Sequence, residues 1–170
     1  MLVENILVIV VAAFLLGFGG AIFGICWVPT KRKQYEIIAK TAKLKPGMVF
    51  CDLGSGTGSL LFYLAKNYKV QCVGVEISPV LYLYSKIKSL FYKNISIKFN
   101  NFFNYNLAGC DVVYFYLHPK LMPKIIQKLQ KELKPGALVI SYGFVIPGYA
   151  PEKFIEQPGQ LSVYFYHNMQ

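Results

Sequence analysis

Residues 49–58 read VFCDLGSGTG, and this short stretch decides the expected fold. An apolar, β-prone run ends in Asp52, a glycine-rich turn follows, and an apolar segment with helical spacing comes next. This order predicts a strand, a tight turn and a helix. Gly54, Gly56 and Gly58 leave the backbone bare, so that a ligand can lie against it. The first N–H groups of the following helix lack intrahelical partners and face the same turn.

The spacing within this turn excludes two common phosphate-binding loops. A P-loop ends in Gly-Lys-Ser/Thr, and that ending is absent. A dinucleotide-binding loop has glycine at its first, third and sixth positions, whereas the sixth position counted from Gly54 is Ser59. Asp52 would repel an anion, but it would pair with the ammonium group of a zwitterion such as S-adenosylmethionine (SAM). The turn therefore predicts a SAM site, the alternative being an ordinary glycine-rich connection.

A second acid follows a second expected strand. Residues 73–75 read VGV, and Glu76 comes directly after them, about one strand–helix unit beyond Asp52. This separation is close to the roughly 20-residue offset at which an acid meets ribose hydroxyls in related folds. A carboxylate can accept hydrogen bonds from both hydroxyls of a ribose. We therefore expect Glu76 to bind ribose, the alternative being a strand-end acid that faces water.

Residues 52–58 together with Glu76 resemble motifs I and II of class I SAM-dependent methyltransferases. Three further features narrow the resemblance: an apolar N-terminal segment that ends in Pro29-Thr30, the sequence LKPG at 44–47, and YLHP at 116–119. Together they resemble a small family of membrane-anchored protein-lysine methyltransferases. Its mitochondrial members methylate the ATP synthase c subunit and the adenine nucleotide translocase. The resemblance covers nearly the whole chain and implies a Rossmann-like α/β fold with SAM as the cofactor.

Composition bounds the classes of function that the chain can have. A chain of 170 residues is expected to hold one domain, and its hydrophobic content of 55% is high for a soluble one. The net charge of +10 fits either solubility or attraction to anionic lipid headgroups and acidic partners. The four cysteines form no CxxC pair and have no histidine at metal spacing, so we expect no metal site. No nucleic-acid-binding motif occurs, and we expect no nucleic-acid partner.

An uncharged apolar stretch begins at Ile6 and ends at Val28, which is long enough to cross a bilayer. A signal peptide would have positive charge before a shorter apolar core and a cleavage site after it, and neither is present. Residues 31–33 read KRK, so the positive-inside rule places the rest of the chain on the cytoplasmic side, or on the matrix side in a mitochondrion. We therefore expect a single-pass anchor over residues 1–30 and a methyltransferase domain over residues 31–170.

Gly20 and Gly24 form a GxxxG match inside this apolar stretch. Three interpretations stay open: a weak homodimer through the anchor, contact of the flat helix face with a membrane-embedded substrate, and chance in a glycine-rich segment.

Alternating strand-like and helix-like segments predict a mainly parallel sheet covered on both faces. The first expected helix either covers the sheet edge or closes over the SAM pocket. A late pair of β-like stretches predicts an antiparallel C-terminal hairpin. Little sequence separates the fifth strand from this hairpin, so a helix is missing there, and the open site suits a protein substrate. Expected strands span residues 48–53, 71–76, 96–99, 112–117, 137–142, 153–157 and 160–167; expected helices span 33–44, 60–67, 79–92 and 119–133.

Ligands of parallel sheets bind beyond the carboxyl ends of the strands, which selects one further cofactor residue. In the methyltransferases that the chain resembles, an acid after the third strand accepts a hydrogen bond from the adenine amino group. Asn101 takes that place, and its amide oxygen can still accept. The expected cofactor-binding residues are Asp52, Gly54, Ser55, Gly56, Gly58, Glu76 and Asn101.

Tyr116 and His118 close the fourth expected strand, where the resemblance implies residues that face the methyl acceptor. Lysine methylation needs a neutral amine in line with the methyl group and the sulfonium, so most of the catalysis is positioning. We expect Tyr116 to hydrogen-bond the amine or to offer its ring to the cation. We expect His118 to accept the proton, because imidazoles titrate near neutral pH. The alternative is a histidine that only begins a helix.

Two other functions stay open at this point. The first is a methyltransferase that acts on a lipid, a quinone or another small molecule at the membrane face. The second is a non-catalytic module that binds RNA or membrane through its lysines.

Overall fold

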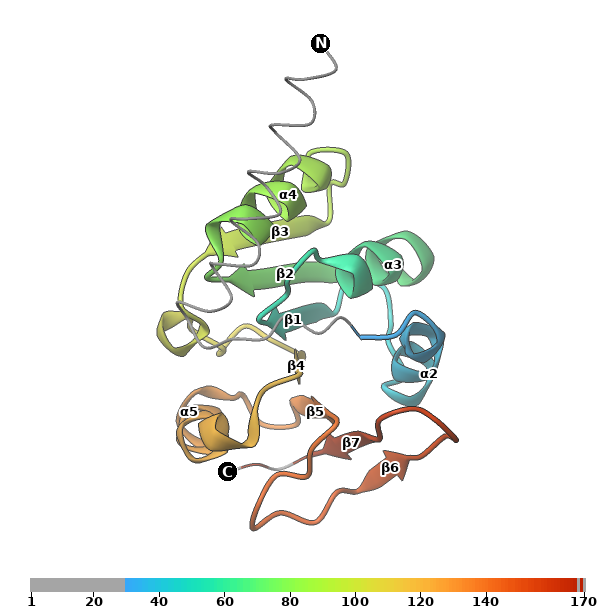
Figure 1. Cartoon of the computed structure of the whole chain (residues 1–170), viewed down its shortest axis with the longest axis vertical. Coiled ribbons are helices and arrows are strands. Elements are labelled where there is room, and N and C mark those ends of the chain that lie inside the picture. The colour runs from blue at the N-terminus through green and yellow to red at the C-terminus, as the bar shows by residue number, and fades with distance from the viewer. Residues whose placement is uncertain (1–29, 168, 170) are drawn as a thin grey trace, which may run out of the picture.

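A seven-stranded mixed sheet forms the centre of the molecule in the computed structural model, which describes residues 30–167 and residue 169 (Figure 1). Its strand order is β3-β2-β1-β4-β5-β7-β6; the first five strands of this order pair in parallel, and β7 pairs antiparallel with both of its neighbours. This arrangement confirms the expected Rossmann-like methyltransferase sheet and its C-terminal hairpin. The strands are β1 (Val49–Leu53), β2 (Gln71–Glu76), β3 (Ile95–Phe99), β4 (Val112–Phe115), β5 (Leu138–Tyr142), β6 (Lys153–Ile155) and β7 (Val163–Tyr166).

Within the described residues, three helices and two short 3-10 turns connect the strands, and a further helix, α2, precedes β1. Residues 143–152, between β5 and β6, contain no helix, as the short sequence there predicts. The connection from β3 to β4 holds a 3-10 turn instead of a full helix. The helices are α2 (Lys33–Thr41), α3 (Ser59–Tyr68), α4 (Pro79–Ser89) and α5 (Met122–Glu132), and the 3-10 turns are η1 (Phe102–Asn104) and η2 (Pro119–Leu121).

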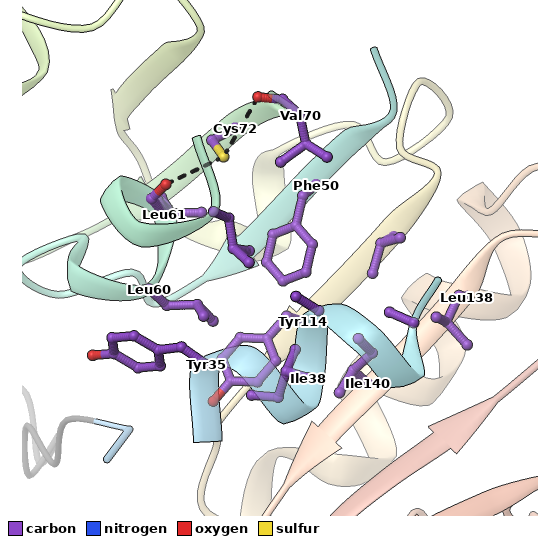
Figure 2. Packing of buried hydrophobic residues seen from close by; sticks show 14 of the residues in the cluster. Tyr35, Ile38, Phe50, Leu60, Leu61, Val70, Cys72, Tyr114, Leu138 and Ile140 are labelled. Carbon is purple, nitrogen blue, oxygen red and sulfur yellow. Dashed lines mark hydrogen bonds between the residues drawn. The ribbon is translucent and has the colours of Figure 1, made fainter. Parts of the chain in front are cut away.

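Two hydrophobic cores lie on opposite faces of the sheet, because successive strand residues point to opposite sides. On one face, Phe50 of β1 and Tyr114 of β4 pack under α2 and α3 (Figure 2). On the other face, Cys51 and Val113 from the same strands pack with α5. The first face matters most here, since it also carries the buried carboxylate Asp52.

Several element boundaries differ from the expectation. β4 ends at Phe115, so that Tyr116 leaves the sheet instead of closing the strand. The helix expected from residue 119 begins as the 3-10 turn η2, with α5 proper starting at Met122. α2 stops at Thr41 because Lys43 adopts a left-handed conformation (φ 50°), which a helix interior cannot accommodate.

Within residues 30–167 and 169, no helix combines the length and the apolar character that crossing a bilayer requires. The predicted anchor from Ile6 to Val28, including Gly20 and Gly24, lies outside the described residues.

Candidate active site

The glycine-rich turn between β1 and α3 adopts the backbone that its sequence predicts. Gly54, Gly56 and Gly58 have φ values of 83°, 55° and 71°, in the left-handed region that favours glycine. The N–H groups of Gly54 and Ser55 donate to the Val75 carbonyl at 2.9 and 3.1 Å, which anchors the turn on β2. The turn is therefore a fixed cradle of backbone at the carboxyl end of the sheet.

Glu76 holds the far side of this cradle. Its Oε2 accepts from the Gly56 N–H at 2.7 Å, and its Oε1 accepts from the Ser78 N–H at 2.8 Å. The side chain is buried, with 6% exposure. Each carboxylate oxygen keeps a further lone pair. The carboxylate is thus oriented by the protein and still able to accept hydrogen bonds from a ligand diol.

Asp52 lies beside Glu76 on the same edge of the sheet. The residue is 5% exposed, and in the sheet it pairs with Gly74 on β2 and with Tyr114 on β4. Burial raises the pKa of Asp52 to about 8, and the charge of Glu76 adds to this rise. Burial and repulsion by Glu76 both disfavour the ionised form of Asp52. A cationic ligand would offset both effects, so the pair of carboxylates favours such a ligand.

The segment before α2 contacts β4 at Tyr114, the residue that pairs in register with Asp52. The Thr30 hydroxyl lies 2.5 Å from the Tyr114 hydroxyl. Burial raises the pKa of Tyr35, a hydrogen bond with Ser59 lowers it, and the charge of Asp52 raises it again. The helix packs into the core through Tyr35, Ile38 and Ala39, and its closure over the pocket stays a prediction. Sequence reasoning missed Tyr35 and Tyr114 because both read as core aromatics.

Ser55 packs on the side of the turn that faces the sheet. Its buried Oγ has no hydrogen-bond partner among the described residues and lies over Gly74 of β2, close to Leu61. The expected contact of Ser55 with the cofactor therefore stays a prediction. The turn, Asp52 and Glu76 together fit the zwitterionic nucleoside that the sequence predicts.

Gly74 lets the cradle close onto the sheet. A Cβ at this position would lie 2.6 Å from Ser55 Oγ and 2.8 Å from Leu61 Cδ1, closer than real side chains approach. We expect Gly74→Ala to lower the free energy of unfolding by about 1–3 kcal/mol, as overpacking does, and to weaken binding at the displaced turn. Urea titration with and without S-adenosylhomocysteine would measure both effects.

The control for this change is Gly109→Ala, because nothing lies within 4 Å of a Cβ built there. Equal stability of the two alanine variants would show that the turn does not depend on the bare backbone of β2.

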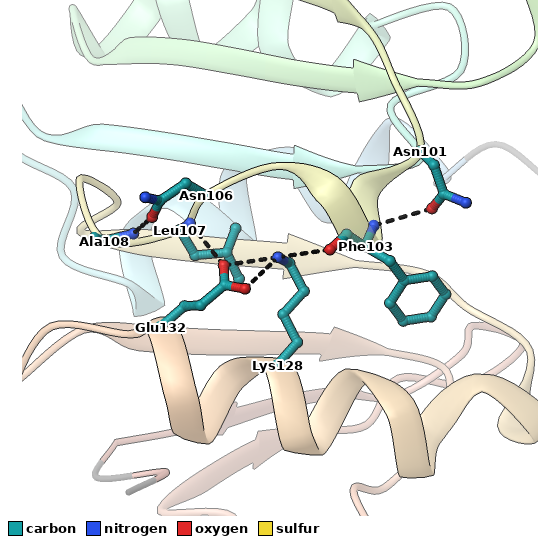
Figure 3. A network of polar contacts seen from close by, with 7 residues as sticks. All are labelled: Asn101, Phe103, Asn106, Leu107, Ala108, Lys128 and Glu132. Atoms are coloured by element: carbon teal, nitrogen blue, oxygen red, sulfur yellow. Dashed lines mark hydrogen bonds and ion pairs between the residues drawn. The ribbon is translucent and has the colours of Figure 1, made fainter.

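Asn101 lies at the rim, where it caps η1. Its Oδ1 accepts from the Phe103 N–H at 3.0 Å, and the side chain is exposed. The Phe103 carbonyl in turn accepts from Lys128 Nζ at 3.1 Å (Figure 3). The expected contact of Asn101 with adenine stays a prediction, since one acceptor site of this oxygen is already used.

Lys128 and Glu132 tie this rim to α5. Lys128 is 7% exposed, and its Nζ lies 2.7 Å from both Glu132 oxygens, while Glu132 also accepts from the Leu107 N–H at 3.1 Å (Figure 3). Sequence reasoning missed this pair. Its only signal is the four-residue spacing of opposite charges on a helix.

The segment after β4 lies beside the cofactor turn, since a Cβ on Gly54 would be 3.9 Å from Leu117. The Tyr116 ring meets Tyr142 edge-on at 4.9 Å between centroids and lies near Phe144 at 6.4 Å. These rings form an aromatic wall that composition could not locate. His118 is exposed, and its Nδ1 accepts from the Lys120 N–H at 3.2 Å, so the structure shows the helix-start contact that was its alternative role.

The sheet order, the glycine turn preceded by a buried acid and the second acid after β2 define a class I SAM-dependent methyltransferase. The chain belongs to the family described as the ANTKMT methyltransferase domain, whose model matches residues 52–153.

Two relatives are named as lysine methyltransferases. The chain is 33% identical over 147 residues to a protein-lysine N-methyltransferase of Saccharolobus islandicus (strain REY15A), covering 82% of this chain and 91% of that protein. It is 28% identical over 129 residues to the lysine N-methyltransferase of the ATP synthase c subunit from Xenopus laevis, covering 74% of this chain and 56% of that protein.

Two solved structures share the fold. An RNA methyltransferase from Salinibacter ruber, crystallised with S-adenosylhomocysteine, matches with a TM-score of 0.78 and 26% identity over 82% of this chain and 92% of that one. A SAM-dependent methyltransferase from Thiobacillus denitrificans, also with S-adenosylhomocysteine, shares the fold with a TM-score of 0.59 and 19% identity over 68% of this chain and 49% of that one. SAM is accordingly the methyl donor of this enzyme.

Proposed function

We propose that this enzyme transfers a methyl group from SAM to the side-chain amine of a lysine in a membrane protein. The main support for methyl transfer is the buried pair Asp52 and Glu76 at the glycine-rich turn. Lysine as the acceptor is supported by the named activities of relatives that align over most of the chain.

The binding roles follow from the contacts in the cradle. Asp52 pairs with the ammonium group of SAM, and the lone pairs left on Glu76 accept from the ribose hydroxyls. Gly54, Gly56 and Gly58 let the ligand lie against the backbone, and Asn101 at the rim meets the adenine.

The transfer step exchanges one bond for another. When bound, SAM supplies a methyl group on a positively charged sulfur. The lone pair of a neutral lysine amine forms the new N–C bond while the C–S bond breaks and its electron pair stays on sulfur. Tyr116 and its aromatic neighbours stabilise the cationic product, because ring faces attract ammonium groups. The proton leaves to water or to His118, which lies exposed at the end of the same segment.

The proposal places the enzyme at a membrane through residues 6–28, with its domain on the cytoplasmic or matrix side and a weak homodimer through the anchor. It includes no nucleic-acid partner.

The test is transfer of tritium from methyl-labelled SAM into membranes from cells that lack the protein. Wild-type enzyme is expected to label the protein fraction, and hydrolysis should release methyl-lysine. Gly56→Arg is the inactive variant, because arginine would be strained at φ 55° and would fill the cradle. Gly109→Arg is its matched control at a position with open space.

Three results would contradict the proposal. Equal labelling by wild type and Gly56→Arg would show that this site does not transfer methyl groups. Label confined to the lipid extract would make the acceptor a lipid or quinone. Label confined to RNA would make the acceptor a nucleic acid, as the name of the Salinibacter ruber structure says of that protein.

A further inference from the structure

Large apolar side chains cover the outer face of α4 and its continuation. Leu90 and Phe91, just beyond the helix, are 75% and 84% exposed, and Leu83, Tyr84 and Ile87 are each more than half exposed. Phe99, at the end of β3, adds a further exposed ring. These six residues are called the α4 apolar surface below.

The polarity of α4 is inverted. Its buried face consists of Leu81, Ser85 and Ser89, at helical spacing. The two serine hydroxyls donate to carbonyls of their own helix, Ser85 to Leu81 at 2.8 Å and Ser89 to Lys86 at 2.7 Å. A helix on a water-exposed surface normally buries its apolar residues and exposes its serines. The outer face of α4 therefore fits an apolar environment better than it fits water.

Positive charge adjoins this surface. Lys86 lies on α4 and the exposed Lys93 follows in the turn after it, and no Asp or Glu occurs between Glu76 and Asp111. Lys88 instead lies over the Phe62 ring of α3 at 4.4 Å, and Lys98 points to the sheet face opposite that of Phe99. Apolar residues flanked by lysines are the pattern of segments that lie in the interface of an anionic bilayer. A second copy of the chain fits less well, because pairing through this face would bring the same lysines together.

The α4 apolar surface lies at one end of the sheet and runs from Phe99, at the carboxyl ends of the strands near the cofactor rim, to Leu90 and Phe91, near their amino ends. α4 packs beside the edge strand β3, and the other edge strand, β6, lies at the opposite end of the molecule (Figure 1). The Phe99 ring contacts Tyr82 at 5.1 Å between centroids, and Phe99 is followed within two residues by Asn101 at the rim. A bilayer in contact with this surface would therefore lie along the β3 edge of the sheet, with the Phe99 end of the surface near the opening of the site.

We propose that the α4 apolar surface inserts into the interfacial layer of an anionic membrane. This contact is separate from the predicted anchor and places the β3 edge of the sheet against the bilayer. It goes beyond the proposed function and does not depend on which acceptor is methylated.

The test uses the full chain reconstituted in vesicles, with an environment-sensitive fluorescent amino acid at position 91. The matched control carries the same probe in place of Phe154, which is 55% exposed on β6 at the other end of the sheet. Vesicles contain phosphatidylcholine with or without phosphatidylserine, and brominated acyl chains act as the quencher. In anionic vesicles, quenching at position 91 is expected to be at least about threefold stronger than at position 154, because only the former lies at acyl-chain depth.

The lysines provide a second measurement. Lys86→Gln with Lys93→Gln should lower the ratio of quenched to unquenched probe at position 91 by about tenfold or more, since each surface lysine contributes about fivefold to anionic lipid binding. The control pair is Lys124→Gln with Lys131→Gln, two exposed lysines on α5. Binding of S-adenosylhomocysteine checks that every variant is folded.

Three outcomes would overturn this proposal: no quenching at position 91, equal quenching at positions 91 and 154, or an emission shift at position 91 that depends on protein concentration before lipid is added. The last would show that a second copy covers the surface. None of these readouts requires methyl transfer, so their failure is distinct from failure of the proposed function.

Discussion

Replacing Glu76 with glutamine is expected to weaken SAM binding by at least about 100-fold. Both oxygens of this carboxylate already accept backbone N–H groups, Gly56 at 2.7 Å and Ser78 at 2.8 Å. Glutamine offers one acceptor oxygen, so its NH₂ group would face one of these two donors. The variant also loses the charge that strengthens each ribose hydrogen bond, and bonds to charged groups contribute about 1.5–3 kcal/mol each. Calorimetric titration with SAM and S-adenosylhomocysteine would measure the loss.

The same substitution should lower the stability of the unliganded protein by about 1–3 kcal/mol, because one buried N–H group loses its acceptor. The control is Glu36→Gln, which removes one charge from an exposed pair with Lys40 and should change neither quantity. A Glu76→Gln protein that binds SAM within about threefold of wild type would show that this carboxylate does not hold the ribose.

Asp52→Asn is expected to change stability and SAM affinity in opposite directions. Burial raises the pKa of Asp52 from 3.8 to about 8, so the unliganded fold keeps a proton that the unfolded chain releases. Stability of the wild type must therefore fall as pH rises from about 4 to about 8, and then level off. Asparagine does not titrate and avoids this cost. Near pH 8 the variant should melt about 3 °C or more above wild type, the shift that about 1 kcal/mol produces in a domain of this size.

SAM affinity should show the reverse dependence. The ammonium group of SAM pairs with the ionised carboxylate, so binding below pH 8 must displace the Asp52 proton. Wild-type affinity should thus rise with pH up to about 8, whereas Asp52→Asn should bind about 10- to 100-fold more weakly with little of this slope, having lost a charge-assisted bond. Melting and calorimetric titration from pH 5 to 9 would separate the two effects. A variant that is less stable than wild type at pH 8 would contradict the burial cost, and an unchanged affinity would contradict the ammonium contact.

Local sequence motifs predict most of the fold and the glycine-rich cradle. The run from Asp52 to Gly58 predicts its strand, turn and helix because each step depends on neighbouring residues. Glu76 followed from its position one strand–helix unit later. The parallel order of the strands then brings both acids to one edge, which is why the two halves of the site could be predicted without a structure.

The remaining parts depend on contacts between distant segments. Nothing near Thr30 in the sequence indicates that its hydroxyl meets Tyr114. The inverted face of α4 was also hidden, because serines and large apolar residues both recur there at helical spacing, and only packing shows which face turns inward. His118 occupies the predicted place but uses its Nδ1 to begin η2, a contact that its sequence position left undecided.

The insertion of β7 between β5 and β6 makes the molecule intolerant of losing its C-terminal hairpin. β5 is buried along its whole length and pairs with β7 from Val139 to Tyr142. Cleavage before Val163 would turn this interior strand into a bare, apolar edge with open hydrogen-bonding groups. Such edges recruit strands from other chains, so a clipped copy would aggregate or be degraded instead of persisting as a weaker enzyme.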